Sequence, residues 1–113
     1  MLKNAIDSVF FSFAFRQKSV AFVGYSIGVG AGVRAVEHLN HIMLEAEALP
    51  VRATLIPFVT NAFDAEGKPT NPLLELTGTV MLEDVAWLGK ALKTARAEGQ
   101  LLPAGLRLRA ARK

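Results

Sequence analysis

Short, mainly apolar runs alternate along the chain with segments in which apolar residues recur every three or four positions. Residues 20–23 form a continuous apolar run and residues 51–57 form a second short run, and both predict strands buried in a sheet. Helical spacing predicts helices over residues 2–15, 33–48 and 72–97. The expected order is therefore helix, strand, helix, strand, helix.

This alternation predicts an α/β fold built on parallel strands. Two strands joined by a helix make a right-handed βαβ unit. Because two parallel strands do not form a stable sheet on their own, the pattern looks like half of a doubly wound domain. We expect one folded unit over residues 1–99 and a basic tail over residues 100–113.

Helix-breaking and capping residues predict the ends of the helices. Pro50 is expected to end the second helix, Asn71 to cap the third with Pro72 at its first position, and Gly99 to end the third. Residues 16–19 are expected to form a polar break after the first helix, and residues 58–72 a loop. The second helix has an apolar stripe of Val36, Leu39, Ile42, Met43 and Ala46. The third is expected to pack inward through Leu76, Val80, Leu82, Val85, Leu88 and Leu92.

The net charge of +3 is concentrated at the C-terminus, where Arg107, Arg109, Arg112 and Lys113 follow the last acidic residue, Glu98. The rest of the chain has nearly as many basic as acidic residues, so a cationic groove for nucleic acid is not expected in the folded part. We interpret the tail as a frayed, solubilising end, and contact with RNA or acidic lipid stays open.

The chain has no cysteine, which excludes disulfides, zinc–thiolate sites and a thiol nucleophile. No segment has the roughly 20 apolar residues of a membrane span. The apolar stretch near the N-terminus, residues 9–15, is short and interrupted by Ser12, and no small-residue cleavage site follows it, so a signal peptide is not expected. We therefore expect a cytoplasmic protein without a membrane partner.

One stretch suggests a binding site. A glycine-rich turn, with Gly24, Gly28, Gly30 and Gly32, joins the first predicted strand to the second predicted helix. In open α/β sheets, ligands bind beyond the carboxyl ends of the strands. Glycines there allow a phosphate or a flat ring to approach the backbone, or they allow tight packing of strand against helix without any ligand. Residue spacing leaves both interpretations open.

Two common nucleotide motifs are excluded. The dinucleotide fingerprint GxGxxG would begin at Gly28 and Gly30, but its third glycine would fall at Val33. The acidic residue expected at the end of the next strand is also missing, since Ile56 and Pro57 stand there. The Walker pattern fails because no Lys-Ser or Lys-Thr follows the glycines.

Several segments, in this order and spacing, resemble the NADPH-dependent FMN reductase family, including its azoreductase- and quinone-reductase-like members. The resemblance is carried by residues 2–7 (LKNAID), 20–26 (VAFVGYS), 32–39 (GVRAVEHL), 50–52 (PVR), 56–57 (IP), 63–67 (FDAEG), 81–84 (MLED), 87 (W) and 91–92 (AL). It spans residues 2 to 96 and corresponds to the C-terminal half of the family's domain.

The resemblance implies a partial flavodoxin-like, three-layer fold and a flavin-dependent oxidoreductase. In that family, FMN binds at the strand ends, takes a hydride from NAD(P)H and passes it to an acceptor such as a quinone or an azo compound. The implied cofactor-binding residues are Gly24, Tyr25, Ser26, Gly28, Gly30 and Gly32, with Tyr25 beside the ring. Hydride transfer needs no catalytic side chain, so none is assigned. The resemblance also implies a homo-oligomer, a dimer or tetramer.

This chain departs from the family pattern. The family's first strand and its serine- and arginine-bearing phosphate loop have no counterpart here, and the glycine-rich turn is about one residue longer than usual. Two alternatives to an enzyme therefore remain open. One is a non-catalytic flavodoxin-like module that acts by oligomerisation or protein interaction, and the other is a reading frame cut short.

The other candidate residues have simpler interpretations. His38 and His41 are three apart on one helix, but no third ligand converges with them, so no metal site is expected. Arg34 is expected to face solvent or to pair with Glu37. Trp87 is expected in the core or in a subunit interface, and stacking on a ligand is the alternative. Phe58 and Phe63 lie in the long loop, where they could cap a pocket or an interface.

Overall fold

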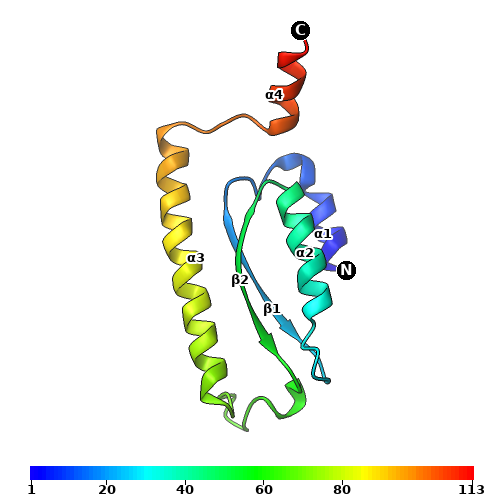
Figure 1. The fold of residues 1–113 in the computed structure, drawn as a ribbon, viewed down its shortest axis with the longest axis vertical. Helices are drawn as coiled ribbons and strands as arrows, with labels where there is room; N and C mark the ends of the chain where they lie inside the picture. Colours follow the sequence, from blue (N-terminus) through cyan, green and yellow to red (C-terminus); the bar gives the residue numbers. More distant parts are fainter.

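The computed structural model describes residues 1–113, and it alternates helices with two parallel strands (Figure 1). Helix α1 (Leu2–Ser8) and a 3₁₀ turn (Phe10–Ser12) precede β1 (Ser19–Tyr25). Helix α2 (Val33–Glu45) leads to β2 (Leu49–Ile56), a second 3₁₀ turn (Val59–Asn61) leads to α3 (Pro72–Glu98), and α4 (Ala104–Ala111) ends the chain. The expected α/β class and element order are confirmed, and the arrangement is a partial flavodoxin-like fold.

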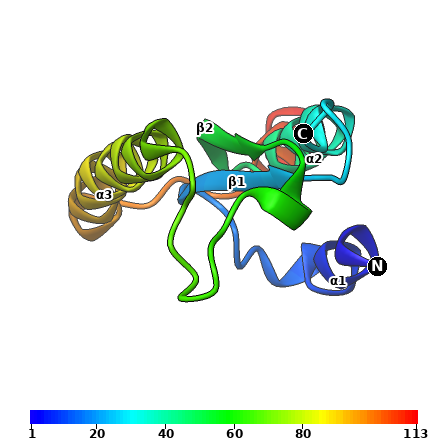
Figure 2. The ribbon, with the colours of Figure 1, turned by 90° about the horizontal axis from the view of Figure 1, so that it is seen from below.

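The sheet contains only β1 and β2, which pair in parallel. Residues 21–25 pair one to one with residues 52–56, after a bulge between Val20 and Ala21. Helices α2 and α3 cover opposite faces of this sheet, as Figure 2 shows. On the α3 face, the Ser19 and Thr54 hydroxyls donate to the Val85 and Thr77 carbonyls, at 3.0 and 3.3 Å.

The core is small because two strands offer little area to the helices. Its buried centre is Ile6 from α1, Met43 from α2 and Ala48. Partly buried residues around it are Phe15, Val20, Phe22, Leu39 and Ile42. The stripe predicted for the second helix faces this core, which confirms that part of the pattern.

The first helix is shorter than predicted. It ends at Ser8 instead of continuing to residue 15. The Ser8 and Ser12 hydroxyls donate back to the carbonyls of Ala5 and Val9, at 2.7 and 2.6 Å, which offers the backbone an alternative to continued α-helix. Phe13 then takes a left-handed conformation (φ 56°), which turns the chain away from the helix axis.

Pro50 does not end the second helix, so that prediction was wrong. Helix α2 stops at Glu45, and Glu47 takes a positive φ of 58° before the chain enters β2 at Leu49. Pro50 is the second residue of β2, a place where a strand in a two-stranded sheet tolerates the missing N–H. Strands β1 and β2 also start earlier than predicted, and β1 continues through Gly24 and Tyr25.

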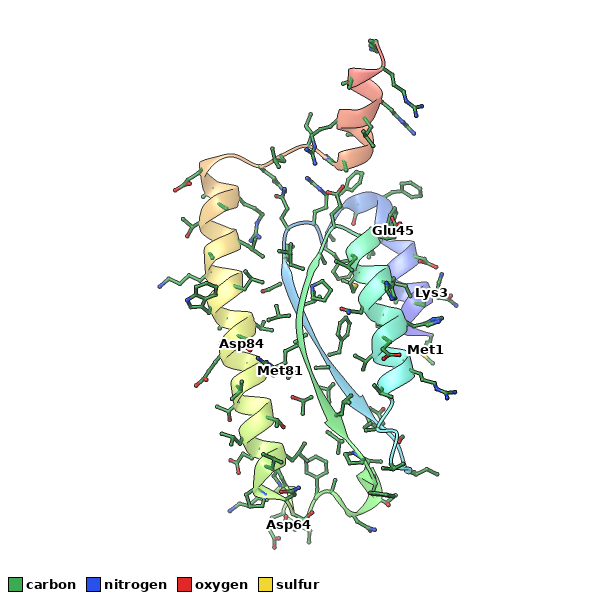
Figure 3. All side chains as sticks on the ribbon, viewed as in Figure 1. Met1, Lys3, Glu45, Asp64, Met81 and Asp84 are labelled. Carbon is green, nitrogen blue, oxygen red and sulfur yellow. The ribbon has the colours of Figure 1, made fainter.

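The third helix begins and ends as predicted. The Asn71 side chain accepts a hydrogen bond from the Leu73 amide at 3.0 Å, and Gly99 is the C-cap. The residues that α3 buries against the sheet agree only partly with the prediction. Val80, Val85, Leu88 and Leu92 are half-buried and Met81 points toward the strands (Figure 3), whereas Leu76 and Leu82 are exposed.

The C-terminal segment is ordered as a helix, so the expectation of a frayed end was wrong. Helix α4 lies at the end of the molecule opposite the strand carboxyl ends (Figure 1). No helix combines the length and the apolar character that crossing a bilayer requires.

Candidate functional site

The glycine-rich turn lies where the sequence predicts it, between the carboxyl end of β1 and the first turn of α2 (Figure 1). Gly24 and Tyr25 belong to β1, so the turn itself consists of residues 26–32. These residues are called the glycine loop. The end of β2 and the segment after it support this loop. The Ser26 amide donates to the Ile56 carbonyl at 3.3 Å, and the Phe58 and Val59 amides donate to the carbonyls of Gly28 and Ser26, at 3.3 and 2.9 Å.

The loop's amide groups are its main chemical feature. No amide from residue 27 to residue 32 donates a hydrogen bond, and neither do those of Arg34 and Ala35 in the first turn of α2. The N-cap of α2 is Gly32, and no side chain caps this end. Unpaired amides at a helix N-terminus favour an anion or another electron-rich acceptor. The exposed part of this row is residues 27–30, since Ala31 is buried.

Two of the four glycines are required by packing alone. A Cβ on Gly24 would lie 2.7 Å from the Ala31 carbonyl oxygen and 2.9 Å from side-chain atoms of both Val36 and Leu55. Gly32 has a φ of +75°, and a Cβ there would lie 3.1 Å from the Tyr25 backbone. Tight packing of strand against helix therefore explains why these two positions are glycine.

The other two glycines have no such explanation. A Cβ on Gly28 or Gly30 would meet nothing within 4 Å, and neither residue has a positive φ. Neither the space around them nor their backbone conformation requires glycine. Packing and backbone conformation therefore do not explain glycine at these two positions, and the bare backbone there leaves space for a ligand.

Of the two side chains predicted to contact a ligand, one is free to do so and the other already forms a hydrogen bond within the loop. Tyr25 ends β1 beside the loop and is 66% exposed, so its ring is available to a ligand. The Ser26 hydroxyl instead donates to the Gly28 carbonyl at 2.8 Å, so it already helps to shape the loop.

Two hollows lie near the loop. One, of about 290 Å³, runs along β1 between α1 and α2 and includes Tyr25 and Gly32. The other, of about 430 Å³, lies between the end of β2 and the start of α3, and Phe58 lines it. Its polar lining of Asn61, Thr70, Asn71 and Thr77 was not predicted, because these residues come together only when the loop folds against α3.

The remaining candidates stay outside the site. His38 and His41 are exposed on α2, and no three metal-ligating side chains cluster anywhere in the chain. Arg34 is exposed and forms no ion pair with Glu37. Trp87 is 75% exposed, which excludes the core interpretation. Phe63, the other loop aromatic, is also exposed.

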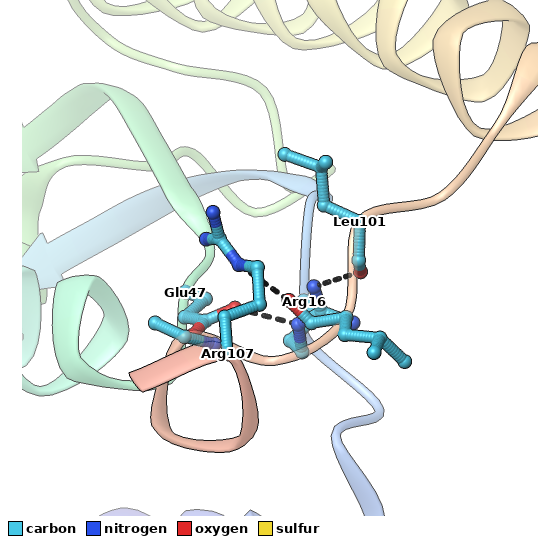
Figure 4. Close-up of polar contacts among 6 residues, drawn as sticks. Arg16, Glu47, Leu101 and Arg107 are labelled. Atoms are coloured by element: carbon cyan, nitrogen blue, oxygen red, sulfur yellow. Dashed lines mark hydrogen bonds and ion pairs between the residues drawn. The ribbon is translucent and has the colours of Figure 1, made fainter. Parts of the chain in front are cut away.

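An ion pair that the sequence pattern did not reveal, between a buried arginine and a partly exposed glutamate, lies at the opposite end of the molecule (Figure 4). Arg16 is only 5% exposed, and its Nε lies 2.5 Å from Oε2 of Glu47. The second carboxylate oxygen of Glu47 accepts from the Ala104 amide at 2.7 Å, and Arg16 also donates to the Leu101 carbonyl. The pair therefore fastens the start of α4 to the body.

These contacts also change the acidity of Glu47. The hydrogen bond from Arg16, followed by that from the Ala104 amide, lowers the pKa of the Glu47 carboxyl below its ordinary value. Arg16 had been taken as part of a polar break, and nothing in its local sequence distinguishes it from an exposed arginine.

Comparison with known proteins gives one result. The family model described as NADPH-dependent FMN reductase matches residues 1–61, which include β1, the glycine loop, α2 and β2. No curated protein and no solved structure matches the chain significantly.

The matched residues are fewer than the resemblance in the sequence suggested. We expected it to run to residue 96 and to represent the C-terminal half of the family's domain. The match ends at residue 61 and lies in the N-terminal part of this chain, which does not bear out that assignment. Because it covers more than half of the sequence, the chain belongs to the NADPH-dependent FMN reductase family.

Proposed function

We propose that this chain binds FMN at the glycine loop and takes part in NAD(P)H-dependent reduction of a small electron acceptor, such as a quinone or an azo compound. The observation that supports it most is the row of unpaired amides from residue 27 to residue 32. It lies within the part of the chain that matches the family.

The residues present fit a flavin. The rim of the isoalloxazine ring carries carbonyl oxygens and ring nitrogens that accept hydrogen bonds, and the loop offers donors without competing side chains. Gly28 and Gly30 leave the backbone open to a flat ring, and the exposed Tyr25 ring is close enough in the chain to flank it. Gly24 and Gly32 act indirectly, because they let the loop fold tightly against β1 and α2.

Bound FMN supplies the redox chemistry, since it accepts a hydride from NAD(P)H and passes the electrons to the acceptor. The chain's own part is to bind and orient the ring. Its amide donors would stabilise the electron density that the ring gains on reduction, and the positive end of the α2 dipole acts in the same direction. This chemistry requires no acid–base side chain.

Flavin fluorescence tests the proposal. FMN titrated into the purified chain should lose fluorescence as it binds. The substitution Gly30→Val, which puts a branched side chain into the open space over the loop, should weaken binding by about tenfold, or about 1.4 kcal/mol. Gly105→Ala is the matched control, because Gly105 also lies in open space but in α4, at the other end of the molecule.

Two results separate binding from catalysis. Absence of binding at high micromolar FMN, or equal affinities of the wild type and Gly30→Val, would contradict the proposed site. Binding without FMN-dependent oxidation of NADPH would instead favour the non-catalytic module. The free edge of β1, which pairs with β2 on one side only, is the observation that favours this second candidate function.

A further inference from the structure

The hollow of about 430 Å³ between the end of β2 and the start of α3 is a second place where the chain can hold a small molecule. Its volume lies within the range of about 300–1,000 Å³ that is usual for ligand sites. All its lining residues belong to one continuous segment, residues 55–77, which runs from the end of β2 through the following loop into α3. We call this hollow the β2–α3 pocket.

Hydrogen bonds hold the loop that encloses the β2–α3 pocket. The Asp64 amide donates to the Lys68 carbonyl at 2.8 Å, and the Asp64 carboxylate accepts from the Lys68 amide, also at 2.8 Å. The Thr70 amide donates to the Ala62 carbonyl at 2.9 Å, and the Thr70 hydroxyl donates to the Asn61 carbonyl at the same distance. Because its walls are already fixed, the pocket loses little conformational entropy when a ligand binds.

The β2–α3 pocket shares a wall with the glycine loop. Phe58 lines the pocket, and its amide donates to the Gly28 carbonyl at 3.3 Å. Ile56 also lines it, and its carbonyl accepts from the Ser26 amide, again at 3.3 Å. The end of β2, the start of α3 and the glycine loop all lie at the same end of the molecule (Figure 1). A molecule in the pocket would therefore lie beside a ring bound at the glycine loop.

The pocket is lined by apolar, aromatic, amide and hydroxyl groups and by no charged side chain. The Phe58 side chain is 52% exposed, so its ring is available for stacking. The Asn61 side chain forms no hydrogen bond within the chain, so its amide group is free to donate one. By contrast, the hollow of about 410 Å³ at the other end of the molecule is lined by Glu45, Glu47 and Arg109. A lining without charge disfavours a charged ligand, since a charge that leaves water needs a partner.

We propose that the β2–α3 pocket binds the electron acceptor and that this acceptor is an uncharged quinone. This rests on the proposed function, in which NAD(P)H supplies the electrons. A quinone has a flat ring that can stack on Phe58 and a carbonyl oxygen that can accept from Asn61. It gains one hydride and takes one proton from solvent to become a hydroquinone. A sulfonated azo compound, by contrast, carries a negative charge for which the pocket offers no counter-charge.

Binding of para-naphthoquinone to the flavin-free chain, followed by backbone amide NMR, tests the pocket separately from flavin binding. The amide signals of residues 55–62 and 70–77 should shift saturably, because these residues form the pocket. The ring sulfonate of the same naphthoquinone should bind at least about tenfold more weakly, since it differs by one charge.

Two substitutions and a matched control test the contacts. Phe58→Ala removes the stacking ring and should weaken quinone binding by about tenfold. Asn61→Leu keeps the side-chain size, removes the amide donor and should weaken it by about fivefold. Phe63→Ala should leave it unchanged, because Phe63 is an exposed aromatic residue of the same loop that does not line the pocket. Amide signals of the glycine loop at their wild-type positions would show that each variant is folded there.

The quinone and flavin proposals fail separately. Phe58→Ala and Asn61→Leu should keep the wild-type affinity for FMN, whereas Gly30→Val should keep the wild-type affinity of the flavin-free chain for the quinone. Flavin binding without any saturable shift of the pocket amides by para-naphthoquinone would overturn the quinone site alone. Equal affinities for the quinone and its sulfonate would overturn it too, as would wild-type quinone affinity in both Phe58→Ala and Asn61→Leu.

Discussion

At the scale of single residues, the four glycines around the loop divide into two pairs with different roles. Gly24 and Gly32 are surrounded by backbone and side-chain atoms, whereas Gly28 and Gly30 face open space. Glycine content alone could not separate these roles, because the sequence does not show which positions touch other parts of the chain. Because a Cβ would be crowded at one pair and free at the other, alanine substitutions can test whether the two pairs have different roles.

Replacing the packed glycines should destabilise the fold. Gly24→Ala should lower the free energy of unfolding by about 1–3 kcal/mol through overpacking. Gly32→Ala should cost about 1–2 kcal/mol because alanine is strained at positive φ. Gly28→Ala should change stability by less than about 0.5 kcal/mol. Urea unfolding measures all three, and equal losses for Gly24→Ala and Gly28→Ala would show that the two positions are not distinguished by packing.

The Arg16–Glu47 pair should make stability depend on pH. Because the folded-state pKa of Glu47 is lowered, its contribution is complete above the ordinary glutamate pKa and is lost as the pH falls toward the folded-state value. Near neutral pH, Glu47→Gln should reduce the free energy of unfolding by about 1–2 kcal/mol, because it removes the counter-charge of the buried Arg16 at a contact that solvent partly screens.

The difference between the wild type and Glu47→Gln should shrink as the pH is lowered from neutral through and below the ordinary glutamate pKa. Urea unfolding over this range measures it, with Glu45→Gln as the control, since Glu45 is exposed and forms no ion pair. A difference that stays constant with pH would show that the carboxylate charge of Glu47 contributes nothing.

At the scale of elements, the sequence correctly predicted those helix ends that depend on neighbouring residues alone. Asn71, Pro72 and Gly99 mark the ends of α3 because capping is a property of neighbouring residues. The end of α2 was misplaced because it depends on Glu47, whose positive φ accompanies a contact with Arg16, 31 positions away. The orientation of Leu76 and Leu82 was also wrong, since a sheet of two strands covers only part of a helix as long as α3.

The cap of α3 gives a prediction at this scale. Asn71→Ala removes the acceptor for the Leu73 amide and should lower the free energy of unfolding by about 1 kcal/mol. Asn71→Asp keeps an acceptor and places a negative charge at the helix N-terminus, so it should match or exceed the wild type. Thermal unfolding followed by circular dichroism compares the three, and an alanine variant as stable as the wild type would exclude a stabilising cap.

At the scale of the whole molecule, the apolar pattern correctly predicted parallel strands with helices, and it also indicated that two strands are too few. The structure adds where the sheet is open and which end of it carries unpaired amides. Neither feature could be read from the sequence, since edge exposure and hydrogen-bond pairing depend on the complete fold. The unpaired amides support the proposed binding of flavin at one end of the sheet.

Flavin contact at the glycine loop is measured most directly by following the backbone amide NMR signals of the labelled chain while FMN is added. The amides of residues 27–32 should shift saturably, because they are the unpaired donors of the site. The amides of α4, at the opposite end of the molecule, should not move. Shifts that are absent from the loop, or confined to the hollow between Phe10, Phe13 and Leu106, would contradict the proposed FMN site.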